Sequence, residues 1–367
     1  MLLIFWVSAA FIAYVYAGYP VLLWLWARAR PCVAAPVGTD PYRPDVSIVV
    51  AARNEGPLLA ARIDNLLQLD CSSAQRQIVV VSDGSTDDTL AVLDRYRSSV
   101  DVVAVPAGGK ALALNAGVAH ARHDVLVFAD ARQTFAADAL LELTAHLRDP
   151  RVGAVSGELV LGGESTIADG VDLYWRYEKQ IRRHESAVWS MLGATGAIYA
   201  MRRSLWQPLP ADTILDDVLA PMRAVLGGYR VVFNERARAF DRTAPDAQAE
   251  AHRKVRTLAG NCQILWLEPR LLLPWRNPVW LQYISHKVGR LFVPYALLAL
   301  FASSIALANR SLVYAAALLG QCVFYLLAGY GGWLELQGTT ASVNMQRTTP
   351  LARRESRPAD RAGAINA

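Results

Sequence analysis

Polar clusters follow two short apolar runs in the central part of the chain. The letters RNE occupy positions 53–55 directly after the run Val46–Ala52, and DGSTDDT occupies 83–89 shortly after the run Gln77–Val81. Ligands of open α/β sheets bind where the carboxyl ends of the strands meet their loops, so both clusters are candidates for holding a nucleotide. Helix capping and turn formation are the alternative roles of these residue types.

Charged residues further along the chain are suited to binding phosphate. Lys110 follows two glycines at the start of an expected helix, where backbone N–H groups and the helix dipole favour anions. Asp130 and Arg132 follow the apolar run Val125–Phe128. Because an arginine can bind phosphate through two parallel hydrogen bonds, this part of the chain indicates a phosphorylated ligand.

A pair of aspartates precedes another expected helix. Asp216 and Asp217 stand directly before the helical pattern Val218–Leu226, which ends at two glycines. A carboxylate on the rigid first turn of a helix is well placed to remove a proton from a reacting hydroxyl. Capping of the helix is the alternative role, and the two roles are compatible.

Alternating strand and helix patterns predict that these clusters belong to an α/β sheet. The expected strands are Val46–Ala52, Gln77–Val81, Asp101–Val105 and Val125–Phe128, and the expected helices lie around Leu58–Leu69, Asp87–Tyr96 and Ala111–Ala121. The polar clusters are therefore expected at strand ends and helix starts.

In this order, the clusters resemble the motifs of family 2 glycosyltransferases over most of the region from Pro44 to Gln263. The matching letters are NE at 54–55, DGSTD at 83–87, GKALALN at 109–115, GATGAIYAMRR at 193–203 and the last aspartate of TILDD at 213–217. The resemblance implies an α/β fold of the GT-A type, a Rossmann-like domain that binds a nucleotide sugar. It also implies transfer by a single displacement, which inverts the anomeric carbon.

The resemblance further implies a role for each matching residue. Asp217 is expected to be the catalytic base that deprotonates the acceptor hydroxyl. Asp83 is expected to contact the base or ribose of the donor. The expected nucleotide-sugar-binding residues are Ala52, Arg53, Asn54, Glu55, Asp83, Gly84, Lys110, Asp130 and Arg132, and the expected phosphate or acceptor residues are Asp216, Arg253 and Arg256.

Several positions depart from the family pattern. Arg132 stands where a second carboxylate of an Asp-x-Asp metal site is usual, so we expect Mg2+ or Mn2+ on Asp130 or, alternatively, a metal-free arginine clamp. Leu215 and Asp216 replace the first two residues of Thr-Glu-Asp, and only its last aspartate, Asp217, is kept. Arg253 and Thr257 replace the glutamine and the tryptophan of Gln-x-x-Arg-Trp, whose arginine is Arg256. The missing tryptophan favours limited transfer over processive extension of a polymer, and binding to lipid headgroups is the alternative role of this basic helix.

Apolar segments flank the central region. Leu2–Trp26 contains no charged residue and is long enough to cross roughly 30 Å of hydrocarbon as a helix. Leu291–Ala308 and Leu312–Trp333 are two further runs of this kind, separated by a short turn that contains Arg310. Arginines follow the first run and recur in the carboxy-terminal tail. The positive-inside rule therefore predicts a multi-pass protein of the plasma or inner membrane with a cytoplasmic catalytic domain.

The composition agrees with membrane attachment. Of the 367 residues, 53% are hydrophobic, which is high for a soluble protein. The net charge of +5 suits anionic lipid headgroups and phosphorylated substrates better than nucleic acid, because the basic residues gather beside the apolar runs and in the tail. The four cysteines lack the paired spacing of zinc or redox sites, as suits a reducing cytoplasm.

The sequence thus predicts a membrane-anchored enzyme made of six segments. They are an amino-terminal transmembrane helix (1–27), a juxtamembrane linker (28–43), a cytoplasmic GT-A glycosyltransferase domain (44–263), an interfacial amphipathic segment (264–290), a transmembrane hairpin (291–335) and a polar, basic, disordered tail (336–367). The expected reaction moves a sugar from a nucleotide diphosphate, UDP-linked, to a lipid-linked or growing glycan acceptor in cell-envelope or exopolysaccharide synthesis.

Two alternatives fit the same residues. A polyprenyl-phosphate or ceramide glycosyltransferase would make a single transfer to a lipid, which the missing tryptophan and the few membrane spans allow. A catalytically lapsed homologue would bind nucleotide sugar or other polysaccharide-assembly proteins, which the departures at Arg132, Leu215 and Thr257 allow. Product analysis distinguishes the first alternative from the expected reaction. A comparison of donor hydrolysis by the wild type with that by Asp217→Asn distinguishes the second.

Overall fold

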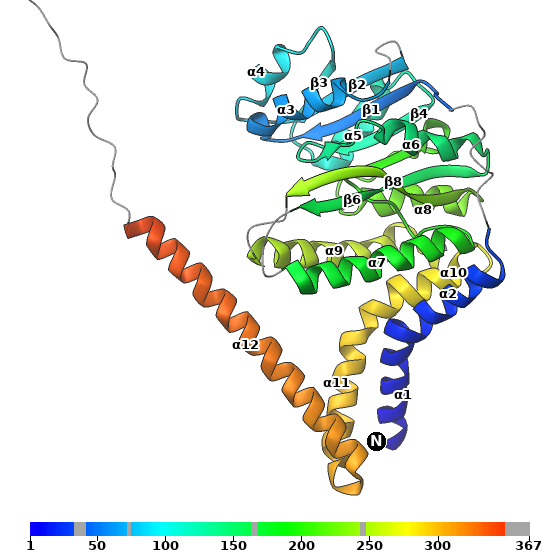
Figure 1. Cartoon of the computed structure of the whole chain (residues 1–367), viewed down its shortest axis with the longest axis vertical. Helices are drawn as coiled ribbons and strands as arrows, with labels where there is room; N and C mark the ends of the chain where they lie inside the picture. The colour runs from blue at the N-terminus through cyan, green and yellow to red at the C-terminus, as the bar shows by residue number, and fades with distance from the viewer. Residues whose placement is uncertain (33–41, 72–74, 163–167, 243–246, 349–367) are drawn as a thin grey trace, which may run out of the picture. The chain divides into compact units, whose positions relative to one another are not determined.

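The computed structural model describes residues 1–32, 42–71, 75–162, 168–242 and 247–348. The chain divides into two units, Trp6–Leu298 and a second made of Met1–Phe5 with Ala299–Ala367. Figure 1 labels the elements along the chain. The first unit contains the sheet and every residue of the candidate site.

The described residues form one eight-stranded mixed sheet with the order β3-β2-β1-β4-β7-β6-β8-β5. Its strands are β1 (Val46–Ala52), β2 (Arg76–Asp83), β3 (Asp101–Val105), β4 (Val125–Asp130), β5 (Thr134–Phe135), β6 (Val152–Gly162), β7 (Ile198–Arg202) and β8 (Arg230–Arg242). β1 to β4 run parallel, whereas β7 is antiparallel to β4. The expected bounds of β1 and β3 agree with the structure, and β2 and β4 are slightly longer than expected.

Helices cover both faces of the sheet. They are α3 (Gly56–Leu67), α4 (Thr89–Asp94), α5 (Lys110–His120), α6 (Ala139–Ala145), α7 (Ala168–Val188), α8 (Asp216–Leu226) and α9 (Ala247–Leu267). Ile48 and Val50 belong to the core cluster that includes α3, α4 and α6, whereas Val49 belongs to the cluster that includes α5 and α8. This division follows the alternation of side chains along a strand.

Helix α4 is shorter than the pattern predicted. The carboxylate of Asp87, where the helix was expected to begin, accepts hydrogen bonds from the backbone N–H (3.0 Å) and the hydroxyl (2.5 Å) of Thr89. These bonds close a local turn at Asp87, and the helix begins at Thr89 after its N-cap residue Asp88.

The apolar ends of the chain are helical. Their helices are α1 (Leu2–Ala13), α2 (Tyr19–Ala29), α10 (Trp280–Gln282), α11 (Gly289–Leu307) and α12 (Leu312–Thr348), with π-helical turns at Tyr14–Gly18 and Tyr283–Val288. Three stretches are long and apolar enough to span a membrane: Leu2–Ala29, Trp280–Arg310 and Leu312–Trp333. Helix α12 continues past the predicted end of the hairpin at 335, and the remainder of the predicted tail lies outside the described residues.

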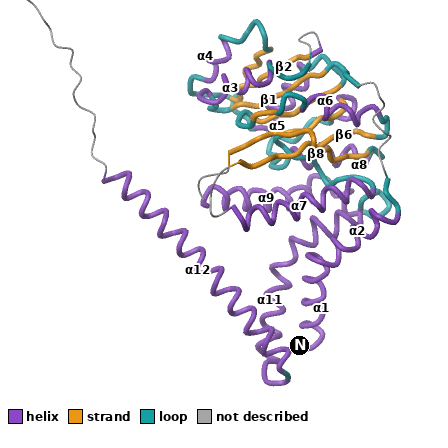
Figure 2. The backbone as a smooth tube through the Cα atoms, viewed as in Figure 1, coloured by secondary structure: helices purple, strands orange, loops and turns teal. Residues whose placement is uncertain are grey.

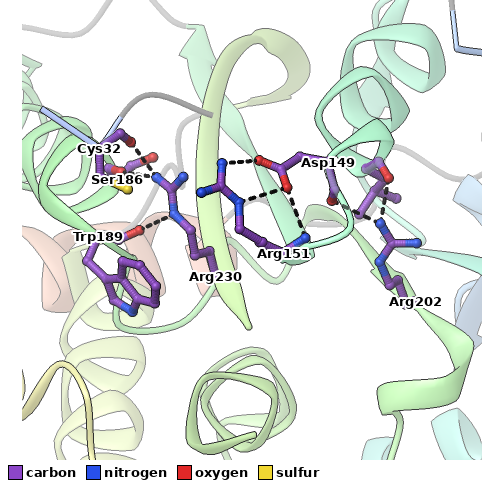
Figure 3. A network of polar contacts seen from close by, with 8 residues as sticks. Cys32, Asp149, Arg151, Ser186, Trp189, Arg202 and Arg230 are labelled. Carbon is purple, nitrogen blue, oxygen red and sulfur yellow. Dashed lines mark hydrogen bonds and ion pairs between the residues drawn. The ribbon is translucent and has the colours of Figure 1, made fainter. Parts of the chain in front are cut away.

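The arginines Arg230 and Arg202 join β8 and β7 to the backbone of neighbouring segments through hydrogen bonds (Figure 3). Arg230, at the start of β8, donates to the backbone oxygens of Trp189 (2.7 Å), Cys32 (2.7 Å) and Ser186 (3.1 Å). These contacts join the residues after α2 to the end of α7 and to the sheet. Figure 2 shows α7 and α9 running beside each other next to the sheet, so elements from both halves of the chain support the same region.

Candidate active site

The carboxyl ends of β1, β2 and β4 lie at one edge of the sheet. Ala51 of β1 pairs with Asp130, and Asp83 is the last residue of β2. The antiparallel β7 begins at the same edge, because its first residue, Ile198, pairs with Ala129. The segment before β7 therefore lies near the strand ends that the sequence singled out.

The loops after β1 and β2 are hydrogen-bonded to each other. The carboxamide oxygen of Asn54 accepts from the backbone N–H of Thr86 at 2.8 Å. The backbone N–H of Asn54 donates to Ser85 Oγ at 3.2 Å. Asn54 has a φ of 56°, a left-handed conformation that asparagine tolerates better than most residues. The N–H of Glu55 donates to Thr89 Oγ1 at 3.1 Å. The two predicted donor motifs thus form one structured surface.

Asp83 organises the loop that leads into α5. Its Oδ1 accepts from the backbone N–H of Gly108 at 2.6 Å, and its Oδ2 accepts from that of Gly109 at 3.0 Å. Arg53 Nη1 lies 3.8 Å from Oδ2. Through these bonds the buried Asp83 holds the two glycines that precede Lys110, the first residue of α5.

Lys110 joins two of the predicted carboxylates. Its Nζ lies 3.1 Å from Asp130 Oδ1 and 3.4 Å from Asp216 Oδ1. Burial disfavours the charged form, but the carboxylates of Asp216 and Asp130 outweigh it and raise the pKa of the Lys110 ammonium. Lys110 therefore stays charged and holds the end of β4 against the start of α8.

Asp217 is held beside this cluster. Its Oδ2 accepts from the backbone N–H of Gly196 at 3.0 Å. Burial and the neighbouring Asp216 raise the pKa of the Asp217 carboxyl to about 6, against the opposing charges of Lys110 and Lys287. A carboxylate with a pKa near neutrality is suited to accept a proton from a hydroxyl.

The remaining predicted donor residues lie around the same edge. Ala52 ends β1 and is buried. Gly84 has a φ of +58°, and a Cβ there would lie 2.5 Å from the backbone nitrogen of Ala107, so this turn requires glycine. Arg132 is largely exposed, and its Nε lies 3.4 Å from Glu55 Oε1. Arg132 is thus tied to the loop after β1.

Helix α9 packs against the loop that precedes Asp216. A Cβ at Gly260 would lie 2.5 Å from Leu215 Cγ, and Gln263 accepts from the N–H of Ile214 at 2.9 Å. Arg256 lies one turn before this contact and is exposed; among the described residues, no ion pair or hydrogen bond joins it to the aspartates. The guanidinium of Arg253 lies 5.6 Å from the centroid of the Trp175 ring. Arg253 thus lies over Trp175, and within the described part of the chain Arg256 forms no ion pair with Asp216 or Asp217.

Residues outside the predicted set complete the surroundings of Asp217. Arg182 of α7 donates from Nη1 to Thr195 Oγ1 at 3.1 Å, and Thr195 precedes Gly196. The segment around Gly196 carried a sequence signal, a glycine pair before a strand. Arg182 carried none, because a charge on an amphipathic helix resembles a solvated surface.

The residues present offer limited ligands for a metal. Among the residues that the structure describes, no group of three or more His, Cys, Asp or Glu side chains could hold an ion. Asp130 Oδ1 contacts Lys110, whereas no ion pair in this part of the chain engages its Oδ2. Because Mg2+ is often held by one or two carboxylates together with substrate phosphates, this oxygen fits a substrate-dependent ion.

Comparisons with known proteins agree with this geometry. Residues 47–207 match the model of Glycosyl transferase family 2. A beta-monoglucosyldiacylglycerol synthase of Synechocystis sp. is 29% identical over 144 residues, which cover 38% of this chain and 30% of that protein. A poly-beta-1,6-N-acetyl-D-glucosamine synthase of Staphylococcus aureus is 24% identical over 200 residues, which cover 51% and 47%. The chain thus spans less than half the length of each of these relatives.

A solved structure shares the fold over nearly the whole chain. It is a mannosyltransferase from Pyrobaculum calidifontis in complex with GDP-Man and Mn2+, which is 24% identical, with a TM-score of 0.68. The similarity covers 91% of this chain and 96% of that one. The mixed sheet is therefore of the GT-A type, as the sequence predicted.

Proposed function

We propose that this chain, which carries a glycosyltransferase family 2 domain, transfers a sugar from a nucleotide diphosphate to an acceptor hydroxyl with inversion of the anomeric carbon. The observation that carries the proposal is the contact between the Gly196 N–H and Asp217, next to a lysine that joins Asp130 and Asp216. It supports a base held at the same sheet edge as the predicted donor residues.

Asp217 acts as the base in this mechanism. The acceptor oxygen attacks the anomeric carbon of the bound sugar while its proton moves to Asp217 Oδ1, the oxygen that the Gly196 N–H leaves free. The bond from the anomeric carbon to the diphosphate breaks, and the nucleoside diphosphate leaves with the bonding electrons. The raised pKa of Asp217 supports this role over the alternative of a catalytically lapsed homologue.

The donor is a nucleotide sugar, and we propose a UDP-linked one. Asn54, Glu55 and Asp83 line the edge where the nucleoside would lie, and Lys110 supplies the cation for its phosphates. The mannosyltransferase with the same fold was solved with GDP-Man, so a GDP-linked donor is the alternative to test against a UDP-linked one.

Asp130 is the proposed ligand of Mg2+ or Mn2+, shared with the donor diphosphate. An ion there would neutralise charge that develops on the leaving group. Lys110 already lies beside this carboxylate, and Arg132 follows two residues later. These two cations can stabilise the leaving diphosphate together with the ion.

The acceptor is proposed to be a lipid-linked or growing glycan at the cytoplasmic face of a membrane. Three stretches of suitable length and hydropathy support membrane attachment. The two curated relatives are named for a glycolipid and for a polysaccharide, so both acceptor types occur among similar proteins.

The purified chain, incubated with radiolabelled UDP- and GDP-sugars and a membrane lipid extract, tests the proposal. We expect label from one donor to enter a chloroform-soluble or polymeric product, and we expect Asp217→Asn to abolish this transfer while nucleotide affinity stays within about threefold. Equal transfer by the wild type and Asp217→Asn would refute the assignment of the base.

A further inference from the structure

The turn at residues 193–196, just before β7, is bonded to Asp217 at two places. The N–H of Ala194 donates to the backbone oxygen of Asp217 at 2.7 Å, and the N–H of Gly196 donates to Asp217 Oδ2 at 3.0 Å. A Cβ at Gly193 would lie 3.2 Å from that backbone oxygen, so the turn closely approaches the start of α8. The turn therefore holds both the main chain and the carboxylate of Asp217.

Thr195 is the residue of this turn that β6 holds. Its backbone N–H donates to Ser156 Oγ at 2.9 Å, and its Oγ1 lies 3.2 Å from the same oxygen. Ser156 belongs to β6 and is fully buried, and Thr195 is only 8% exposed. Because a buried N–H that loses its acceptor is costly, this pair constrains the turn. The position of Gly196, the next residue, thus depends on a side chain of the sheet.

Arg182 reaches the same threonine from α7. Its Nη1 donates to Thr195 Oγ1 at 3.1 Å, so this hydroxyl has partners in both β6 and α7. Ser156, Arg182 and Thr195 come from three separate parts of the chain, and their side chains meet one residue before the N–H that contacts Asp217.

Buried contacts anchor α7 on both sides of Arg182. Glu178 lies four residues before Arg182 and Glu185 three residues after it, so the three share one face of the helix. Arg290 Nη1 lies 2.5 Å from Glu178 Oε1, and His286 Nδ1 lies 2.7 Å from Glu185 Oε1. Both glutamates are buried. Arg182 therefore reaches the turn from a helix that is fastened about one turn before it and one turn after it.

The N–H of Gly196 also affects the chemistry of Asp217. A hydrogen bond donated to a carboxylate favours its ionised form, so loss of this bond should raise the pKa of the Asp217 carboxyl. It should also let the carboxylate move away from the acceptor. A change that displaces the turn is thus expected to alter both the rate of proton transfer and its pH dependence.

We propose that Ser156 and Arg182 are positioning residues for the base: they hold Thr195, and Thr195 keeps the N–H of Gly196 on the carboxylate of Asp217. This inference rests on the proposed function and deepens it, because it says what fixes the base of that reaction. The three residues act through the turn and not by contact with the substrate. Their removal should therefore affect turnover more than donor binding.

Thr195→Val tests the inference, because valine keeps the shape of threonine and lacks its hydroxyl. We expect the turnover number to fall about tenfold, the KM for the nucleotide sugar to stay within about threefold, and the acid limb of the pH profile to move up by about one pH unit. Thr195→Ser keeps the hydroxyl and should have a turnover number within about twofold of the wild type, with its limb in place. An unmoved limb in Thr195→Val would overturn the proposal.

Thr144→Val is the matched control for loss of a buried threonine hydroxyl. Thr144 is buried in α6, and its Oγ1 donates to the backbone oxygen of Leu140 at 2.9 Å. It lines a small cavity with Val46, the first residue of β1, at the opposite end of that strand from the site. We expect a loss of stability with unchanged turnover and an unmoved limb. An equal shift of the limb in this control would also overturn the proposal, because the effect would then be a general one.

Variants of the other two residues test whether they act through Thr195. Ser156→Ala and Arg182→Met should each move the limb to higher pH, and Arg182→Lys, which keeps a donor, should leave it in place. In the double variant Arg182→Met/Thr195→Val we expect no more than the larger single shift. Additive shifts would mean that Arg182 acts on Asp217 separately and would contradict its assigned role. If Thr195→Val does not fold, an unmoved limb in both Ser156→Ala and Arg182→Met would overturn the proposal.

Infrared spectroscopy separates this inference from the proposed function. The carboxyl band of Asp217, assigned by its absence from Asp217→Asn, is titrated in the detergent-solubilised chain without substrate. Absence of sugar transfer by the wild type would refute the proposed function, and the band would still show whether Thr195 controls Asp217. Transfer by the wild type, with a band that titrates identically in the wild type and Thr195→Val, would refute the inference alone.

Discussion

The backbone nitrogen of Gly196 lies 3.0 Å from Asp217 Oδ2, and a Cβ built on Gly196 would lie 2.8 Å from that same oxygen. Any side chain at position 196 must therefore displace the carboxylate. Gly196→Ala should reduce the turnover number at least about tenfold and leave nucleotide affinity within about threefold. Steady-state kinetics and nucleotide titration measure the two effects. Gly162→Ala, where a Cβ would have open space, is the control and should have wild-type turnover.

The pH dependence of transfer should report on Asp217. Burial and Asp216 raise the pKa of this carboxyl to about 6, so it is protonated at a higher pH than an ordinary aspartate. Only the ionised form accepts a proton, and we expect the turnover number to be constant above this value and to fall tenfold per pH unit below it. A rate that stays constant down to pH 4.5 would contradict the assignment.

Asp217→Asn should not lose stability at alkaline pH. Because the folded-state pKa lies above the ordinary one, the native protein holds this proton more tightly than the unfolded chain does. The stability that the proton contributes is therefore lost as the pH rises through about 6, and asparagine avoids this loss. We expect the Tm of the variant at pH 8 to equal or exceed that of the wild type. A clear decrease would mean that its inactivity reflects misfolding.

Removing Lys110 should move the acid limb of the pH profile. Lys110 lowers the pKa of Asp217, so Lys110→Gln should raise that pKa and shift the limb to higher pH. The variant also leaves the buried Asp216 without its cation, and we expect a loss of about 1–3 kcal/mol of unfolding free energy. Lys110→Arg keeps the charge and should keep the limb in place. Denaturant titration and the pH profile check both effects.

Chelation should remove most of the activity if Asp130 shares an ion with the donor. Excess EDTA is expected to lower transfer at least about tenfold, and added Mn2+ should restore it. Electron paramagnetic resonance of Mn2+ gives an independent readout, since binding should require nucleotide and should be lost in Asp130→Asn. Full activity in EDTA would favour the alternative in which Arg132 and Lys110 alone hold the diphosphate.

The sequence predicted those features of the fold that depend on residues close together in the chain. The strands β1 and β3 and the polar residues after β1, β2 and β4 follow from alternation and turn chemistry. The contact of Lys110 with Asp130 was not predicted, because it depends on how β4 approaches α5. The contact of Arg182 with Thr195, the residue before Gly196, was not predicted either, because Arg182 stands in no recognisable motif.

The periodicity of the sequence also does not predict that β6 pairs in parallel with β8, or where α7 lies. The segment 264–290 was expected to lie along a membrane surface because of its aromatic and basic residues, and that contact stays a prediction. Its residues Tyr283, Ser285 and His286 are buried in the protein. A histidine and a serine among apolar residues were the available signal that one side of this segment meets other protein groups.

The position of His286 and Arg290 has a practical consequence for work with this protein. Glu178 and Glu185 lie in α7, but their partners His286 and Arg290 lie in the π-helical turn Tyr283–Val288 and in the first turn of α11. A shortened chain that ends at α9 would leave the buried carboxylate of Glu178 without Arg290 and that of Glu185 without His286. The activity should therefore be measured on preparations in detergent or nanodiscs that keep the apolar segments together with the sheet.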